Sequence, residues 1–237
     1  MSAILNNMSD TIVIKSKERG YFNHGWLKTY HTFSFADYYN HRFMNFGSLR
    51  VINDDVILGK NGFGLHPHKN MEIITYIIDG TLTHSDNLGN KEEIKAGEVQ
   101  VMSAGSGIVH SEWNHGNKPC HLLQIWIMPN QNGGVPSYKI YHPEHFERWG
   151  LVASGFQEVL GVKIKQNAEI YVIDSGSLTQ IEMPPSTSQM TWVHIATGEV
   201  KIDCHTLAAG DSVGFTSSDY NKNIQFASQS KVLVFFV

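Results

Sequence analysis

The stretch Gly62-Phe-Gly-Leu-His66-Pro67-His68-Lys-Asn-Met-Glu72 decides the fold of this chain. His66 and His68 are two residues apart, so on a β-strand both imidazoles lie on one face, whereas on a helix they would diverge. The proline between them also disfavours a helix, because it has no backbone N–H and biases the residue before it toward an extended conformation. Residues 73–78 are then mostly β-branched or aromatic and end at an Asp-Gly turn. The stretch predicts a buried strand that begins beside two histidines and ends in a hairpin.

A second pair with the same spacing, His110 and Glu112, lies in the extended segment 106–114. Two pairs that each lie on one face of a strand can converge, and three neutral imidazoles with one carboxylate form a strong site for a divalent first-row metal ion. A mononuclear site of this kind commonly leaves positions for water, substrate or dioxygen. The spacing leaves one alternative open, because Glu72 has the same parity as His66 and His68 and is a rival to Glu112.

The remainder of the chain is a succession of short strands with turns about every ten residues, a rhythm typical of β-sandwiches and barrels. We predict an all-β protein of two barrels, with a crossing at 131–138 and one short helix over 143–150. Residues 196–213 repeat the pattern of residues 79–100. The positions of the second half that correspond to the first-half ligands hold no histidine: they are Pro184, Ser186, Asn223 and Gln225. We therefore expect a metal-binding domain over 1–135 and a domain over 136–237 that has the fold without the metal ligands.

Two further sets of polar residues receive no functional role from their spacing. Asp54 and Asp55 follow the strand predicted over 47–53, and we interpret them as turn residues, because neighbours in an extended chain face opposite ways. His115 and His121 match neither pair and are left out of the site.

Composition narrows the class of protein. The chain has 237 residues, of which 41% are hydrophobic and 17% charged, as in an ordinary globular protein. Its net charge of −4 and lack of a basic run give no electrostatic footprint for direct nucleic-acid binding. Only Cys120 and Cys204 occur, without a metal-type or disulfide-type spacing, and no apolar run is long enough to span a membrane. We expect a cytoplasmic protein with free thiols and no membrane contact.

The chain resembles the pirin family of bicupins, and in particular the bacterial pirin-like quercetin 2,3-dioxygenases. The resemblance covers nearly the whole chain and is carried by seven stretches: Thr32-Phe-Ser-Phe-Ala-Asp-Tyr-Tyr39, Leu49-Arg-Val-Ile-Asn-Asp-Asp55, Phe63-Gly-Leu-His-Pro-His68, Met71-Glu-Ile-Ile-Thr-Tyr76, Met102-Ser-Ala-Gly-Ser-Gly107, His110-Ser-Glu112 and Leu123-Gln-Ile-Trp-Ile127.

The resemblance implies two jelly-roll cupin barrels packed face to face, with metal in the N-terminal one alone. The ligands that it implies are His66, His68, His110 and Glu112, which favours Glu112 over Glu72. It also favours Fe(II), although sites rich in imidazole accept Ni, Co, Cu, Zn or Mn as well. Similar proteins include non-catalytic, metal-bound regulators that act through protein contacts.

The activity that the resemblance implies is opening of the central ring of flavonols such as quercetin with O2 and release of carbon monoxide. In this hypothesis Glu112 both binds the metal and accepts the proton of the flavonol 3-hydroxyl. Apolar strand faces that include Phe63, Met102 and Trp113 are expected to hold the flat rings. The alternative function is a regulatory or redox-sensing module that binds metal but turns over no substrate.

Overall fold

The computed structural model describes residues 11–142, 148–156, 161–217 and 220–237. Within these ranges the chain forms 22 β-strands, one 3-10 helix, η1 (Ser16–Glu18), and no α-helix. Most of the short helix expected over 143–150 lies outside the described residues, and Gly150 already begins a strand. No helix of the described ranges is long and apolar enough to cross a membrane.

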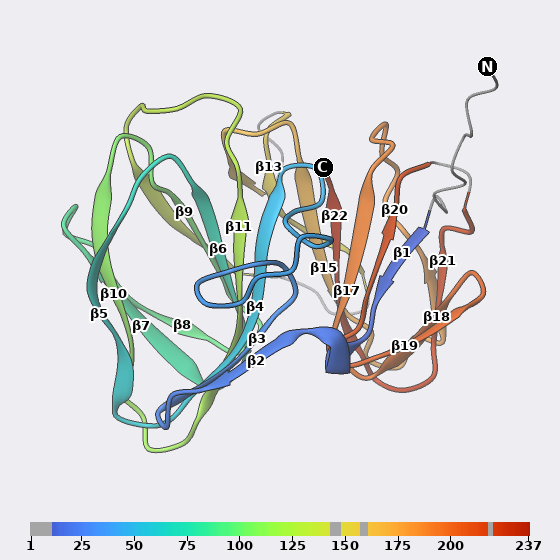
Figure 1. Cartoon of the computed structure of the whole chain (residues 1–237), viewed down its shortest axis with the longest axis horizontal. Helices are drawn as coiled ribbons and strands as arrows, with labels where there is room; N and C mark the ends of the chain where they lie inside the picture. The colour runs from blue at the N-terminus through green and yellow to red at the C-terminus, as the bar shows by residue number, and fades with distance from the viewer. Residues whose placement is uncertain (1–10, 143–147, 157–160, 218–219) are drawn as a thin grey trace.

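The N-terminal half is a barrel of two antiparallel sheets (Figure 1). The larger sheet has the strand order β12 (Ser137–Tyr141), β9 (Val99–Ser103), β6 (Glu72–Asp79), β11 (Cys120–Ile127), β4 (Leu49–Ile57), β3 (Leu27–His31) and β2 (Gly20–Asn23). The smaller sheet has the order β5 (Asn61–His68), β10 (Ile108–Asn114), β7 (Thr81–Asp86) and β8 (Lys91–Lys95).

The C-terminal half repeats this arrangement. Its larger sheet has the order β1 (Thr11–Ile14), β20 (Ser212–Phe215), β17 (Thr191–Thr197), β22 (Lys231–Phe236), β15 (Glu169–Asp174), β13 (Gly150–Ser154) and β14 (Val162–Lys163), and only the last pair is parallel. Its smaller sheet has the order β16 (Gln180–Glu182), β21 (Asn223–Phe226), β18 (Glu199–Ile202) and β19 (His205–Ala208). The prediction of an all-β fold with two jelly-roll barrels is confirmed.

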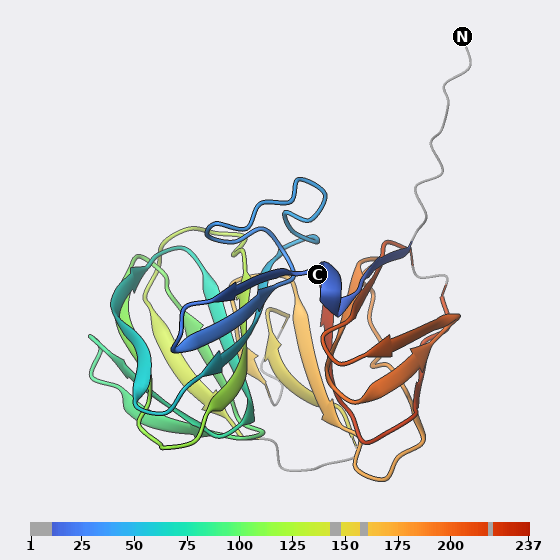
Figure 2. The ribbon, with the colours of Figure 1, turned by 60° about the horizontal axis from the view of Figure 1, so that its bottom comes forward.

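The two larger sheets pack against each other, and the core between them is apolar (Figures 1 and 2). Alternation along β6 shows how one strand serves two cores: Ile74 and Tyr76 belong to this central core, whereas Ile73 and Ile77 face the interior of the N-terminal barrel. The strand is therefore apolar on both faces, which explains why its sequence is an almost unbroken apolar run.

Strand pairing crosses the domain boundary predicted between residues 135 and 136. β1, the first described strand, pairs with β20 of the C-terminal sheet, and β12 pairs with β9 of the N-terminal sheet. Each half thus contributes one strand to the other half's larger sheet, and Figure 1 shows β1 beside β20. The predicted boundary itself stays a prediction.

Truncation of Trp192 tests the contact between the two halves. This side chain is 1% exposed and its ring lies 5.1 Å from the ring of Phe33 and 5.0 Å from that of Phe46, measured between centroids. We expect Trp192→Ala to lower the free energy of unfolding by about 3–5 kcal/mol, since a large buried aromatic leaves a cavity. Urea unfolding measures the change, and Tyr39→Ala, at a side chain that is 74% exposed, should stay within about 0.5 kcal/mol of the wild type. Equal effects of the two substitutions would contradict this packing.

Candidate metal centre

Three histidines converge on the inner face of the smaller N-terminal sheet. His110 on β10 lies directly opposite His66 on the neighbouring β5, and His68 follows His66 on the same face. The ring centroids are 4.4 Å apart for His66 and His110, 4.9 Å for His68 and His110, and 4.8 Å for His66 and His68. One nitrogen of each ring lies within 4.8 Å of one nitrogen of each of the others. The i, i+2 spacing of the sequence thus brings the three imidazoles together.

A bulge in β5 shapes the space next to these histidines. His110 pairs with His66 and Glu112 with Phe63, so β5 has one more residue than β10 in this interval. The bulge turns Phe63 to the face of His66, and the two rings lie 6.3 Å apart. Gly62 is required beside it, because a Cβ at this position would collide with the carbonyl oxygen of Glu112.

The protonation of the histidines suits a metal ion. Burial lowers the pKa of His110 to about 3, and the neighbouring His66 and His84 act in the same direction. Burial also lowers the pKa of His68 to about 4. Both rings are therefore neutral at pH 7, as ligation requires. The Nε2 atom of His110 is buried and has no hydrogen-bond partner. An unpaired imidazole nitrogen beside two further imidazoles fits a divalent first-row metal ion.

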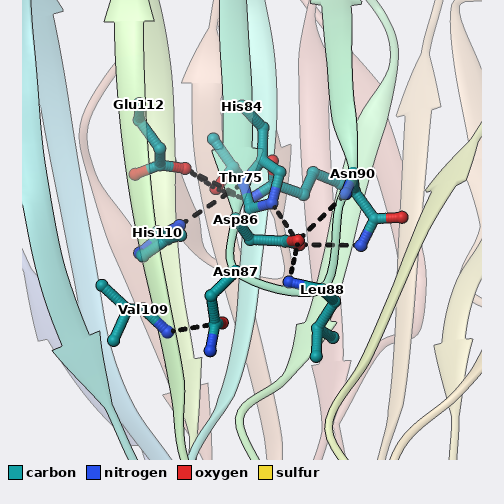
Figure 3. Close-up of polar contacts among 10 residues, drawn as sticks. Thr75, His84, Asp86, Asn87, Leu88, Asn90, Val109, His110 and Glu112 are labelled. Carbon is teal, nitrogen blue, oxygen red and sulfur yellow. Dashed lines mark hydrogen bonds and ion pairs between the residues drawn. The ribbon is translucent and has the colours of Figure 1, made fainter.

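The carboxylate of Glu112 is 1% exposed and is held by two amides. The Gln100 Nε2 atom donates a hydrogen bond to Oε1 over 3.1 Å, and the Gln124 Nε2 atom donates to Oε2 over 2.9 Å. The hydroxyl of Thr75 lies 3.2 Å from Glu112 Oε1 (Figure 3). It also lies 2.9 Å from Gln124 Oε1. Each carboxylate oxygen can accept two hydrogen bonds, so Oε1 is filled by Gln100 and Thr75, whereas Oε2 has one donor and keeps capacity for a metal ion or a proton.

The strand sequences explain where this polar cluster comes from. Thr75, Gln100 and Gln124 point into the barrel from β6, β9 and β11. They separate two apolar clusters of the barrel interior: Ile77 and Leu122 lie in one, and Ile73 and Met102 in the other. The interior is therefore polar at the level of Glu112 and apolar above and below it.

Glu72, the rival carboxylate, lies on another face. It begins β6 with the parity of Ile74, which faces the core between the two halves. Its Oε1 atom accepts a hydrogen bond from the Ser103 hydroxyl over 2.8 Å. Among the described residues, it belongs to neither of the two groups of His, Cys, Asp and Glu side chains with metal-binding geometry.

The second of these groups contains His84, which sequence reasoning missed. It consists of His84, His110 and Glu112, all buried. His84 and Asp86 lie on β7, opposite Glu112 and His110 respectively. They form a third i, i+2 pair, and this spacing is the signal that could have found them. Burial raises the pKa of Asp86, but hydrogen bonds from His84, Asn90 and Leu88 outweigh it, so the pKa is lowered overall.

The interpretation of Asp54 and Asp55 as turn residues is wrong, because both lie within the nine-residue strand β4. Asp54 receives hydrogen bonds from Arg19 over 3.1 Å and from His121 over 2.6 Å. Asp55 has the parity of Ile57 and is 3% exposed. Burial raises the pKa of Asp55 to about 7, and the neighbouring charges of Asp54 and Glu112 act in the same direction. Of these two neighbouring carboxylates, Asp54 is ion-paired with Arg19, whereas Asp55 is buried and has a raised pKa.

The pKa of Asp55 predicts a pH-dependent stability. An aspartate titrates near 3.9 when unfolded and at about 7 here, so burial becomes unfavourable as the pH rises from about 4 to 7. We expect Asp55→Asn to gain about 1.4 kcal/mol per pH unit relative to the wild type across this interval, with no further gain above pH 7. Urea unfolding of the metal-free proteins at pH 5, 6, 7 and 8 measures the difference. A difference that does not change with pH would contradict the raised pKa.

Aromatic side chains lie beside the histidines, although one predicted wall is wrong. The wrong prediction is Trp113, which follows the inward-facing Glu112 on the same strand and therefore faces outward. Its ring lies 6.3 Å from that of His115. Met102 is fully buried in the interior. Trp126 of β11 is the aromatic that sequence reasoning missed: its ring lies 5.1 Å from that of His68, and its buried Nε1 has no hydrogen-bond partner. A hollow of about 470 Å³ adjoins His68 at the edge of β5 and β10.

Comparison with known proteins assigns the chain to a family. Residues 13–127 match the Pirin family and residues 151–237 match the Quercetinase C-terminal cupin domain. The chain is 43% identical over 226 residues to a protein of Escherichia coli K12 named quercetin 2,3-dioxygenase, which covers 93% of this chain and 96% of that one. The chain belongs to the pirin family. A pirin-like protein of Caulobacter vibrioides is 43% identical over 198 residues, covering 81% and 84% of the two chains.

Solved pirin structures have the same fold. The E. coli pirin YhhW in complex with nickel(II) superposes with a TM-score of 0.87 at 41% identity, over 95% of this chain and 97% of that one. A quercetin 2,3-dioxygenase of Acinetobacter baumannii, at 19% identity, shares the fold with a TM-score of 0.72 over 95% and 77% of the two chains. The predicted pirin-family bicupin is confirmed, and a divalent metal ion fits its N-terminal barrel.

Proposed function

We propose that this protein is a metal-dependent dioxygenase that opens the central ring of flavonols such as quercetin with O2 and releases carbon monoxide. The observation that carries the proposal is the convergence of three imidazoles, of which His68 and His110 have strongly lowered pKa values, together with a buried carboxylate, Glu112, that offers an oxygen within 4.8 Å of a His110 ring nitrogen. Relatives that are 43% identical and carry the name quercetin 2,3-dioxygenase support the same reaction.

The proposed ligands of a single ion are His66, His68, His110 and Glu112. The nickel(II) complex of the E. coli pirin supports a divalent ion, and among divalent ions we favour Fe(II) as the native one. When bound, the ion would supply Lewis acidity, which lowers the pKa of a hydroxyl beside it.

Glu112 is the proposed proton acceptor. Its donors Gln100, Gln124 and Thr75 keep the carboxylate in one orientation inside the barrel and leave Oε2 able to accept one more hydrogen bond. The carboxylate therefore takes up the proton of the flavonol 3-hydroxyl without having to rotate. A base fixed in this way contributes typically 10²–10⁴-fold to the rate.

Phe63 and Trp126 are the proposed contacts of the flat flavonol rings. They lie on either side of the histidine cluster, Phe63 beside His66 and Trp126 beside His68. The unpaired Nε1–H of Trp126 can donate a hydrogen bond to a ring oxygen. A flat, polyhydroxylated aromatic molecule suits this combination of apolar surfaces and a few polar atoms.

The reaction is tested by its stoichiometry. Protein reconstituted with Fe(II) under anaerobic conditions and then mixed with quercetin and O2 should consume the two in equal amounts and release one equivalent of carbon monoxide. Quercetin is followed by absorbance, O2 with an electrode, and carbon monoxide by binding to haemoglobin. Metal-loaded protein that consumes neither quercetin nor O2 would favour the regulatory alternative, in which a protein partner takes the place of a substrate.

The cytoplasm is the proposed location. Both cysteines are free, Cys120 buried and Cys204 exposed, which suits a reducing compartment.

A further inference from the structure

A chain of polar contacts leads away from the histidine cluster toward the loop after β7 (Figure 3). The Nδ1 atom of His110 lies 3.4 Å from Nδ1 of His84. On the other side of the His84 ring, Nε2 lies 2.9 Å from Oδ2 of Asp86. The side chains of His84 and Asp86 are fully buried, so no water replaces these contacts.

The chemistry of the atoms determines which atom donates and which accepts in each of these hydrogen bonds. An ionised carboxylate accepts hydrogen bonds and cannot donate them, so a neutral His84 donates its Nε2–H to Asp86. The Nδ1 atom of His84 then has no proton, and its lone pair accepts a hydrogen bond from the Nδ1–H of His110. This leaves the Nε2 atom of His110 without a proton, and that atom is buried and unpaired beside His66 and His68.

We propose that His84 and Asp86 are positioning residues that fix the tautomer of His110 with its Nε2 lone pair free to bind the metal ion. This inference rests on the proposed ligand role of His110. Tyr138 of β12 supports it, because its ring stacks on the His84 ring at 4.2 Å and restricts its rotation. Partners of this kind raise the basicity of a ligating imidazole and fix its orientation.

The loop after β7 fixes the carboxylate itself. Oδ1 of Asp86 accepts the backbone N–H groups of Leu88 over 2.9 Å and of Asn90 over 3.1 Å. Oδ2 accepts the side-chain amide of Asn90 over 2.8 Å, in addition to His84. The two oxygens thus have separate roles, one toward the loop backbone and one toward the histidine.

These roles predict how an asparagine at position 86 would be oriented. In Asp86→Asn the carbonyl oxygen stays with the two backbone donors, and the NH2 group faces Nε2 of His84 and the Asn90 side chain, whose amide must turn its oxygen toward it. That nitrogen must then accept, so the proton of His84 moves to Nδ1 and faces His110. His110 must in turn carry its proton on Nε2, where it blocks metal binding. One isosteric substitution thus reverses the donor and the acceptor in both hydrogen bonds, the one between residues 86 and 84 and the one between His84 and His110.

Two measurements test the inference. Two-bond ¹H–¹⁵N correlation spectra of the metal-free protein report which ring nitrogen of each histidine carries the proton, with His84 and His110 assigned from His84→Gln and His110→Ala. We expect the proton of His110 on Nδ1 in the wild type and on Nε2 in Asp86→Asn. Calorimetric titration with Ni(II) should show that Asp86→Asn binds about 10- to 100-fold more weakly than the wild type.

Matched variants separate this effect from charge and from packing. Glu92→Gln removes an exposed carboxylate opposite His84 on β8 and should bind Ni(II) as the wild type does. In His84→Gln the amide can donate to Asp86 and accept from His110, so affinity should be retained, whereas His84→Leu should lose it. Affinity of Asp86→Asn equal to that of Glu92→Gln, or a wild-type His110 protonated on Nε2, would overturn the inference. Absence of Ni(II) binding by the wild type would instead contradict the proposed metal site, and the tautomer of His110 would still decide the inference.

Discussion

His110→Ala is expected to abolish binding of the metal ion and, with it, oxygen consumption. His110 is the one fully buried imidazole of the three that converge, and its Nε2 atom has no other partner. Loss of an outer partner of a ligand costs about 10- to 100-fold in affinity, and loss of the ligand itself should cost more. Ni(II) titration and metal content after dialysis measure the effect.

His115→Ala is the matched control for this substitution. His115 lies just beyond the same strand and is exposed. Its backbone carbonyl accepts a hydrogen bond from the Lys60 ammonium, and the substitution preserves this contact. The variant should bind metal and consume oxygen like the wild type. Wild-type metal content in purified and dialysed His110→Ala would contradict the proposed ligand set.

Glu112→Gln is expected to keep the metal ion but to lower kcat for quercetin by about 10²–10⁴-fold, the usual contribution of a positioned base. The amide keeps one oxygen that can bind metal, but it cannot take up the proton of the flavonol hydroxyl. Steady-state oxygen uptake at saturating quercetin, expressed per bound metal ion, measures this directly.

Glu72→Gln is the control that separates the two carboxylates. Glu72 hydrogen-bonds to Ser103 on a different face of its sheet, so its substitution should leave oxygen uptake per metal ion close to the wild-type value. Undiminished activity in metal-loaded Glu112→Gln would rule out the role of Glu112 as base. A loss in Glu72→Gln instead would transfer that role to the rival residue.

Much of the fold follows from local patterns. The H-x-H pair, the proline between the histidines and the apolar run after them predict β5 and β6, and the structure has strands at Asn61–His68 and Glu72–Asp79. The period of two along a strand also places His66, His68 and His110 on one face correctly. These features depend only on residues that are close together along the chain, so they can be predicted from the sequence alone.

Features that depend on strand pairing were missed. The bulge in β5 changes which side of the strand faces inward, and it arises from the register between β5 and β10. Trp126 approaches His68 only because β11, in the larger sheet, faces the smaller sheet across the barrel. The exchange of β1 and β12 between the halves is likewise a property of the assembled sheets.

Asp55 and His84 show a different limit. Asp55 was interpreted as a turn residue and His84 received no role, because burial of a polar side chain is visible only when its partners are known. His84 and Asp86 have the same i, i+2 spacing as the two recognised pairs, so a search for every such pair would have found them. Asp55 offers no such signal, since it is distinguished from its neighbour Asp54 by strand parity alone.

The most direct test of the account is oxygen uptake measured against metal occupancy. Metal-free protein is titrated anaerobically with Fe(II), and the initial rate of quercetin-dependent oxygen uptake is recorded at each occupancy, with His66→Ala as the metal-deficient control. We predict a rate that rises linearly and levels at one ion per chain, with no uptake by the variant. Full occupancy without oxygen uptake, or equal uptake in His66→Ala, would contradict it.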